Sequence, residues 1–317
     1  MGTLFNYLYQ FLESASFLLM CAIGMAIIYG MMNVTNMATG QMIMLGAYTT
    51  VLLVNQAHVP LMIAILAACA VVAVVGLILD RLILCRLYDR PMEALVATWG
   101  VSLILAQAVY LLFGPTLEGV AVPFGAVNIG GYSYSVYRFV LIGVAMLAIG
   151  GLYILLNHTR FGLHARATMQ NREIASAMGV NANRMNITTF MLGSALAGLV
   201  GGLYAPTMSI TPSMGNNFLT QAFVPVIVGG SNPLIGTLMA STGLGAVEAV
   251  FTILYGTFTG RMAILLAAIL CVRFMPDGFT SVYLGLKNRK AMKKAKAQKA
   301  ASTPAGPSPV GKGGTTA

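Results

Sequence analysis

The stretch Leu61–Leu79 reads LMIAILAACAVVAVVGLIL, an unbroken apolar run with no charged residue and no amide side chain. A helix that crosses a membrane needs about 20 predominantly apolar residues. Inside lipid, the backbone satisfies its own hydrogen bonds only in a helix or in a closed barrel. Barrel strands alternate apolar and polar residues, and this run does not alternate. The stretch therefore predicts a membrane-spanning helix.

The composition of the whole chain points the same way. Of its 317 residues, 58% are hydrophobic and 8% are charged, and the mean hydropathy is +0.82. A soluble domain is about 25% charged. These values exclude an ordinary soluble enzyme, a disordered chain, a collagen-like fibre and a disulfide-stapled secreted module. The four cysteines show no metal-ligand spacing, so we expect no metal site.

Nine apolar segments are candidates for helices at membrane depth. Two of them, Gln41–Asn55 and Phe218–Val228, are short for a span of about 20 residues. The sequence therefore predicts an all-α, polytopic helical membrane protein with about eight or nine transmembrane or re-entrant helices. The seven better candidates are Phe11–Met32, Val59–Leu84, Ala94–Phe113, Phe139–Leu156, Ile187–Ala205, Leu234–Tyr255 and Ala263–Met275.

Clusters of basic residues predict which loops face the cytoplasm, because cytoplasmic loops carry an excess of Lys and Arg. Three arginines lie within 81–90, four within the loop 157–186, and a Lys-rich tail follows residue 286. The loop 114–137 holds one acid and no basic residue, so we expect it on the outer side. Nine crossings would place the N-terminus outside, and one re-entrant short segment would move it inside.

The chain divides into a transmembrane domain over 1–286 and a tail over 287–317. The tail carries eight basic residues and no acid, whereas the rest carries ten basic and eight acidic residues. Its Pro and Gly content predicts disorder. We interpret it as a cytoplasmic segment attracted to anionic lipid rather than a nucleic-acid binder. Gly306–Lys312 resembles a P-loop, but Gly313 replaces the required Ser or Thr, so we expect no nucleotide site.

Two polar stretches, 33–41 and 206–217, interrupt the apolar pattern. Broken helices at membrane depth are tolerated only where they are buried in protein or line a cavity. In transporters, such breaks in the two halves point to the substrate site. Amides and hydroxyls can bind a small polar solute without imposing a charge; the alternative is that both stretches are ordinary loops. The residues predicted to line a substrate pathway are Asn33, Asn36, Thr39, Gln41, Asn216, Asn217 and Gln221.

Glu248 is an acid deep within the predicted span Leu234–Tyr255. A charge at this depth costs about 2.5–3.5 kcal/mol on insertion scales. It therefore acts either as a gate or solute contact, or as a structural carboxyl that is protonated or paired with an arginine such as Arg261. A run of small residues within 193–202 predicts close helix packing.

A short helix is predicted inside the loop 157–186, where residues 171–179 read NREIASAMG. Asn171 suits an N-cap, and Glu173 falls in the first turn, where the helix dipole favours an acid. Gly179 suits the position after the helix, which requires a positive φ. Long ordered loops are usually functional, so we expect a docking element for a cytoplasmic partner.

These features resemble the permease subunits of ABC importers. Their coupling loop carries Glu-x-Ala followed by Gly, as do Glu173, Ala175 and Gly179, although the Leu-Pro that ends many such motifs is absent here. The chain is more closely similar, over about residues 17–285, to the branched-chain amino acid permease family, which includes urea and short-chain amide permeases. The matching motifs are Gly24, Tyr29-Gly30, NMATG at 36–40, MLGAY at 44–48, TRFG at 159–162, Arg166-Ala167, ALAG at 195–198 and MPDG at 275–278.

Three departures from that family concern the substrate. Thr39-Gly40-Gln41 stands where members often have His-Gly-Glu, and the usual Gly-Gly-x-Gly becomes GGSNP at 229–233. Gln170-Asn171-Arg172 is more similar to the urea branch. The resemblance implies branched-chain or related hydrophobic amino acids as substrates, with urea or a short-chain amide as the alternative.

The resemblance also implies partners. The chain would form one half of a channel in the bacterial inner membrane, with a cytoplasmic C-terminus and a second homologous permease subunit beside it. An external binding protein would deliver the solute, and two cytoplasmic ATPase subunits would use ATP and Mg, so this chain would be no enzyme and bind no cofactor. A passive channel that works without an ATPase is the alternative of a different class. The residues implied in ATPase coupling are Arg166, Arg172, Glu173, Ala175 and Gly179.

Overall fold

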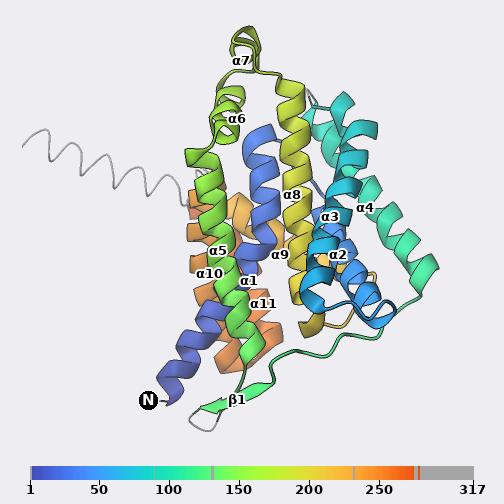
Figure 1. The fold of residues 1–317 in the computed structure, drawn as a ribbon. Coiled ribbons are helices and arrows are strands. Elements are labelled where there is room, and N and C mark those ends of the chain that lie inside the picture. The colour runs from blue at the N-terminus through green and yellow to red at the C-terminus, as the bar shows by residue number, and fades with distance from the viewer. Residues whose placement is uncertain (1, 89, 130–131, 231–232, 275–277, 279–317) are drawn as a thin grey trace, which may run out of the picture. The chain divides into compact units, whose positions relative to one another are not determined.

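The computed structural model describes residues 2–88, 90–129, 132–230, 233–274 and 278. The tail 287–317 and most of the motif at 275–278 therefore lie outside the described residues. The described chain is largely helical (Figure 1). Its helices are α1 (Gly2–Met32), α2 (Thr39–Asn55), α3 (Leu61–Leu82), η1 (Leu84–Arg86), α4 (Pro91–Phe113), α5 (Val136–His158), α6 (Arg160–Gln170), α7 (Arg172–Ala177), α8 (Ala182–Tyr204), η2 (Ala205–Thr207), α9 (Met214–Gly229), α10 (Pro233–Tyr255) and α11 (Thr257–Phe274).

Each of the nine predicted apolar segments is a helix. Among the described residues, seven helices are long and apolar enough to cross a membrane, and these are α1, α3, α4, α5, α8, α10 and α11. The helices α2 and α9 have 17 and 16 residues. At 1.5 Å per residue they are about 24–26 Å long, slightly short of a hydrocarbon core of about 30 Å. The predicted class, an all-α polytopic membrane protein, is confirmed.

The helices extend beyond the predicted spans at several ends. The first helix begins at Gly2 rather than Phe11, and α11 begins at Thr257 rather than Ala263. A hydropathy criterion excludes polar residues at the ends of a span, whereas backbone hydrogen bonding continues through them. The chain between α10 and α11 turns at Gly256, whose φ is +92°, a conformation that glycine adopts without steric cost.

The small residues of α8 let three other helices approach it closely, as their run predicts. A Cβ atom built on Gly24 of α1 would lie 2.7 Å from the carbonyl oxygen of Gly193. A Cβ on Gly198 would lie 2.7 Å from the Cβ of Val72 in α3, and Gly201 packs equally tightly on the backbone of Ile43 in α2. In lipid there is no hydrophobic driving force for helices to associate, so close van der Waals packing of this kind holds them together. The helix α8 therefore lies in the core, against α1, α2 and α3.

Two connections mark opposite ends of these helices (Figure 1). At one end, α6 and α7 join α5 to α8. At the other end lie the N-terminus of α1 and a hairpin of β1 (Ala126–Ile129) and β2 (Tyr132–Ser135). The two strands are antiparallel, with Ala126 opposite Ser135 and Ile129 opposite Tyr132. The sequence pattern does not predict this hairpin, because each strand is only four residues long.

Candidate functional site: an internal polar cavity and a docking loop

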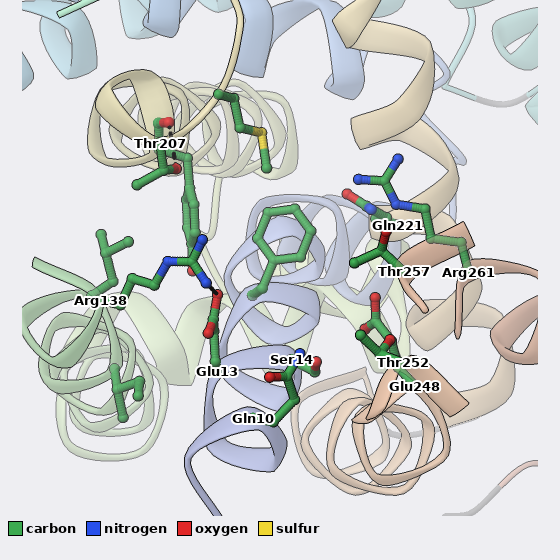
Figure 2. Close-up of a pocket in the computed structure, with 15 residues that line it drawn as sticks. Gln10, Glu13, Ser14, Arg138, Thr207, Gln221, Glu248, Thr252, Thr257 and Arg261 are labelled. Carbon is green, nitrogen blue, oxygen red and sulfur yellow. Dashed lines mark hydrogen bonds and ion pairs between the residues drawn. The ribbon is translucent and has the colours of Figure 1, made fainter. Parts of the chain in front are cut away.

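A cavity of about 270 Å³ lies among seven helical elements (Figure 2). Its lining comes from the N-terminal half of α1, the first turns of α5 and α11, the last turns of α10, the end of α8, the segment around η2, and α9. The lining residues are Gln10, Glu13, Ser14, Phe17, Arg138, Leu141, Ile142, Tyr204, Thr207, Met208, Gln221, Glu248, Thr252, Thr257 and Arg261. The cavity is therefore lined by both apolar and charged side chains. The charged ones are Glu13, Arg138, Glu248 and Arg261.

The charges fall into two groups on different sides of the cavity (Figure 2). Arg138 of α5 donates a hydrogen bond to Glu13 of α1, and the two form an ion pair. On the other side, Glu248 of α10 lies beside Ser14 and within the electrostatic influence of Arg261 of α11. One oxygen of Glu248, Oε2, is buried and has no hydrogen-bond partner in the described part of the chain.

The predicted polar break at 33–41 is mostly self-contained. Asn36 and Thr39 are completely buried. The amide oxygen of Asn36 accepts a hydrogen bond from the Ala38 backbone N–H at 3.0 Å, and the Thr39 hydroxyl donates to the Asn36 carbonyl at 2.9 Å. The Met37 N–H donates to the hydroxyl of Thr98 in α4 at 3.1 Å. These groups fold the chain into the start of α2 and do not line the cavity.

The last residue of that break, Gln41, connects α2 with α9. Its amide nitrogen donates to the side-chain oxygen of Asn216 at 3.3 Å. Directly beside it, Gly40 packs on the backbone of Gly215 and Leu219. The two polar breaks of the sequence therefore meet at this contact.

The predicted pathway residues nevertheless do not gather in one place. Gln221 lines the cavity, whereas Asn216 lines a separate recess beside α4. Asn33 and Asn217 are exposed, and Asn33 has a positive φ of 53°. Sequence reasoning missed Glu13 and Arg138 as neighbours of Glu248. The sequence feature that could have identified both residues is a charge within or at the end of an apolar segment, which is rare in a chain with few charges.

The docking loop, residues 157–186, holds the predicted short helix. The Asn171 side chain accepts hydrogen bonds from the backbone N–H groups of Glu173 and Ile174, both at 3.0 Å. Gly179 has a φ of +86°, and its N–H donates to the Ser176 carbonyl at 3.0 Å. The predicted N-cap and positive-φ glycine are therefore confirmed, and Figure 1 shows α7 at the end of the bundle opposite the N-terminus.

Two large apolar side chains, one on α7 and one at its C-cap, are exposed. Ile174 is 63% exposed and Met178 is 81% exposed, whereas Ala175 is buried against the rest of the loop. Arg166 points back to α5, donating to the Gly162 carbonyl and to the Asn157 side chain. Arg172 donates to the Asn183 side chain at 2.8 Å. Some of the five residues predicted to couple to the ATPase therefore lie on the surface of the loop, and the others make contacts that hold the loop together.

The segment between α3 and α4 contacts the same end of the molecule. The Tyr88 hydroxyl donates to the carboxylate of Asp80, which is buried in α3. Burial, together with this hydrogen bond and the charge of Asp80, raises the pKa of Tyr88 above its usual value. Tyr88 also interacts electrostatically with Arg172. The first arginine cluster and the docking loop are therefore neighbours.

Comparison with known proteins agrees with this architecture. A family model described as the branched-chain amino acid transport system permease component matches residues 7–274. The probable branched-chain amino acid transport permease protein LivH of Methanocaldococcus jannaschii is 28% identical over 285 residues, which cover 84% of this chain and 90% of the relative. The high-affinity branched-chain amino acid transport system permease protein BraD of Pseudomonas aeruginosa is 26% identical over 302 residues, covering 88% and 97%.

A more distant relative carries a different name. The galactose/methyl galactoside import permease protein MglC of Haemophilus influenzae is 27% identical over 208 residues, which cover 62% of this chain and 57% of the relative. No solved structure matches this chain.

The helices and the cavity define a multi-pass membrane protein with a charged cavity between its helices, the architecture expected of a transport subunit. Because the family model covers residues 7–274, the chain belongs to the family of branched-chain amino acid transport permease components. The predicted resemblance to that family is confirmed.

Proposed function

We propose that this chain is the membrane-spanning permease subunit of an ABC importer for branched-chain or related hydrophobic amino acids. The observation that carries the proposal is the family match over residues 7–274. It is supported by a charged cavity near one end of the helices and by the capped helix α7 near the other. A solute entering at one end and an ATPase acting at the other require this separation.

The partners follow from this arrangement. A cytoplasmic ATPase would dock on α7, whose exposed Ile174 and Met178 offer an apolar contact at the tip of a rigid, capped helix. Two ATPase subunits would use ATP and Mg, so the permease itself would hold no cofactor and do no chemistry. A second homologous permease would complete the channel, and an external binding protein would deliver the solute at the hairpin end. The membrane would be the bacterial inner membrane, with the C-terminus in the cytoplasm.

The solute and the energy source are tested together by uptake of labelled leucine or labelled urea into cells that carry the complete system. A matched system with an ATPase unable to hydrolyse ATP is the control. We expect leucine uptake only with the working ATPase. Uptake of urea instead would assign the chain to the amide branch, and uptake that persists without hydrolysis would identify a passive channel.

The docking role is tested by Glu173→Ala and Gly179→Pro. Proline cannot adopt the positive φ of Gly179 and lacks the N–H that bonds Ser176, so α7 loses its C-terminal cap. We expect leucine uptake to fall by about tenfold, within the usual range of coupling between two sites, while the folded protein still reaches the membrane. The control is Glu118→Ala in the outer loop, which should transport normally. Normal uptake by both loop variants would refute the docking role.

A further inference from the structure

We propose that the cavity binds the solute as a zwitterion, with Arg261 holding its carboxylate and Glu248 holding its ammonium group. This inference rests on the proposed function, since it names the charged form of the amino acid that the permease would carry and the residues that would contact it.

The state of the four charges supports this assignment. Glu13 and Arg138 form an ion pair, so each already has a partner of opposite charge. The ion pairs recorded among the described residues, Glu13–Arg138 and Arg90–Glu93, do not include Glu248 or Arg261. Charges at membrane depth are expensive, and they pair with one another or mark a substrate pathway. Glu248 and Arg261 are therefore the two charges of the cavity that form no ion pair among the described residues, although Glu13 also keeps one buried oxygen without a hydrogen-bond partner there.

The positions of these two side chains suit a small dipolar ligand. Glu248 comes from the last turns of α10 and Arg261 from the first turns of α11, on either side of the turn at Gly256. Figure 2 shows both on the same side of the cavity. The buried Oε2 of Glu248 has no hydrogen-bond partner in the described ranges. An ammonium group would supply the missing donor.

The guanidinium is suited to the other end of the ligand. Arg presents a planar fork of N–H donors that matches a carboxylate through two parallel hydrogen bonds. Gln221 and Thr257 line the cavity as well, and their side chains add neutral donors to it. An α-amino acid carries its ammonium and carboxylate on adjacent carbons, so it would contact both charges at once.

The rest of the cavity suits an aliphatic side chain. Phe17, Leu141, Ile142 and Met208 are apolar lining residues of the same cavity. Its volume of about 270 Å³ is just below the range of about 300–1,000 Å³ that holds drug-sized ligands, which fits a small solute. Urea and sugars carry no charge, so they would form no ion pair with Glu248 or Arg261. The cavity therefore favours an aliphatic amino acid over neutral solutes.

The test is direct binding of radiolabelled L-leucine to the permease–ATPase complex in lipid nanodiscs, without the external binding protein, because that protein would impose its own selectivity. We expect the wild-type complex to bind leucine, and leucinamide and 4-methylpentanoate, which each lack one charge, to compete poorly. Arg261→Gln and Glu248→Gln should each weaken binding by about 30-fold, the effect of removing one partner of a buried charge pair.

Matched variants separate a ligand contact from a structural role. Arg261→Lys and Glu248→Asp keep the charges and should retain part of the binding, whereas Arg273→Gln, on the same helix but away from the cavity, should bind leucine as the wild type does. Leucine uptake by the complete wild-type system, combined with unchanged binding in Arg261→Gln and Glu248→Gln, would overturn the zwitterion site and leave the proposed function standing. Absence of both uptake and binding in the wild type would overturn both.

Discussion

Two polar regions interrupt the apolar body of this protein, and they treat their polar groups differently. In the break that precedes α2, the buried Asn36 and Thr39 are hydrogen-bonded to the neighbouring backbone, and Thr98 bonds the Met37 N–H. In the cavity, Glu248 keeps a buried oxygen without a partner among the described residues, and Arg261 is exposed to the open space. Gln41, at the end of the break, is intermediate: its amide nitrogen donates to Asn216, whereas its Oε1 is buried without a partner among the described residues.

This difference in hydrogen bonding distinguishes polar groups that stabilise the fold from polar groups that are available to bind a solute. A polar group that is satisfied by its own protein helps to fold the chain, and its removal leaves an unpaired partner behind. A polar group left without a partner at membrane depth costs stability, so a ligand contact is the reason to keep it. Variants of the break should therefore lose stability, whereas variants of the cavity should lose solute binding at little or no cost in stability.

The largest loss of stability is expected for Gly40→Ala. A Cβ atom at this position would overlap the Gly215 carbonyl oxygen and the backbone of Leu219, so α2 and α9 would have to separate. Overpacking of this kind costs about 1–3 kcal/mol or more. Thermal unfolding of the purified protein in detergent measures the loss. Gly150→Ala in α5 is the control, because nothing lies within 4 Å of its added Cβ; equal stability of the two variants would contradict the close contact.

Asn36→Ala should have the next largest effect. It removes the oxygen that accepts the Ala38 N–H and leaves that buried donor unsatisfied, at a cost of about 1–3 kcal/mol. Asn217→Ala removes an exposed amide and should leave the unfolding temperature nearly unchanged. Leucine binding per folded molecule should stay normal in Asn36→Ala. Loss of leucine binding without loss of stability would instead support the prediction that Asn36 lines the substrate pathway.

A smaller effect is expected at the contact between Gln41 and Asn216. Gln41→Leu removes one hydrogen bond of 3.3 Å, whose net contribution is about 0.5–1.5 kcal/mol. A double-mutant cycle with Asn216→Leu measures the interaction free energy of the pair directly. Additive losses of stability in the double variant would show that the two side chains do not interact.

The smallest effect, of opposite sign, is expected for Glu248→Gln. It replaces a partly unpaired carboxylate by a neutral isostere, so the free energy of unfolding should stay level or rise, on the order of 1 kcal/mol, since the cost of a charge falls away from the bilayer centre. Unfolding curves of the two proteins at the same pH test this. A clear loss of stability would establish Glu248 as a structural partner of Arg261, the alternative that the sequence left open.

Much of the fold follows from the sequence because each helix is a local pattern. Apolar runs of about 20 residues identify the spans, and the cap formed by Asn171 and the glycine at 179 are set by the chemistry of single residues. The close packing of α8 is predicted by its small side chains. The hairpin was missed because strands of four residues carry little periodic signal.

The cavity was recognised only in part. Glu248 and Gln221 stood out in the sequence as polar residues near apolar segments, whereas Glu13 and Arg138 are 125 positions apart and sit at the ends of their spans. Charges at such places are also common at membrane interfaces, where they are solvated. Nothing in the order of residues shows that α1, α5, α10 and α11 bring these four charges to one space.

The sequence by itself determined the class of this protein, its helices, its family and the capped short helix of the loop 157–186, because hydropathy, caps and motifs depend on residues close together along the chain. Only the tertiary structure decided which polar groups are already satisfied and which remain available. That distinction depends on distances between side chains from different helices, such as the ion pair of Glu13 with Arg138 and the lone oxygen of Glu248, and helix packing sets those distances.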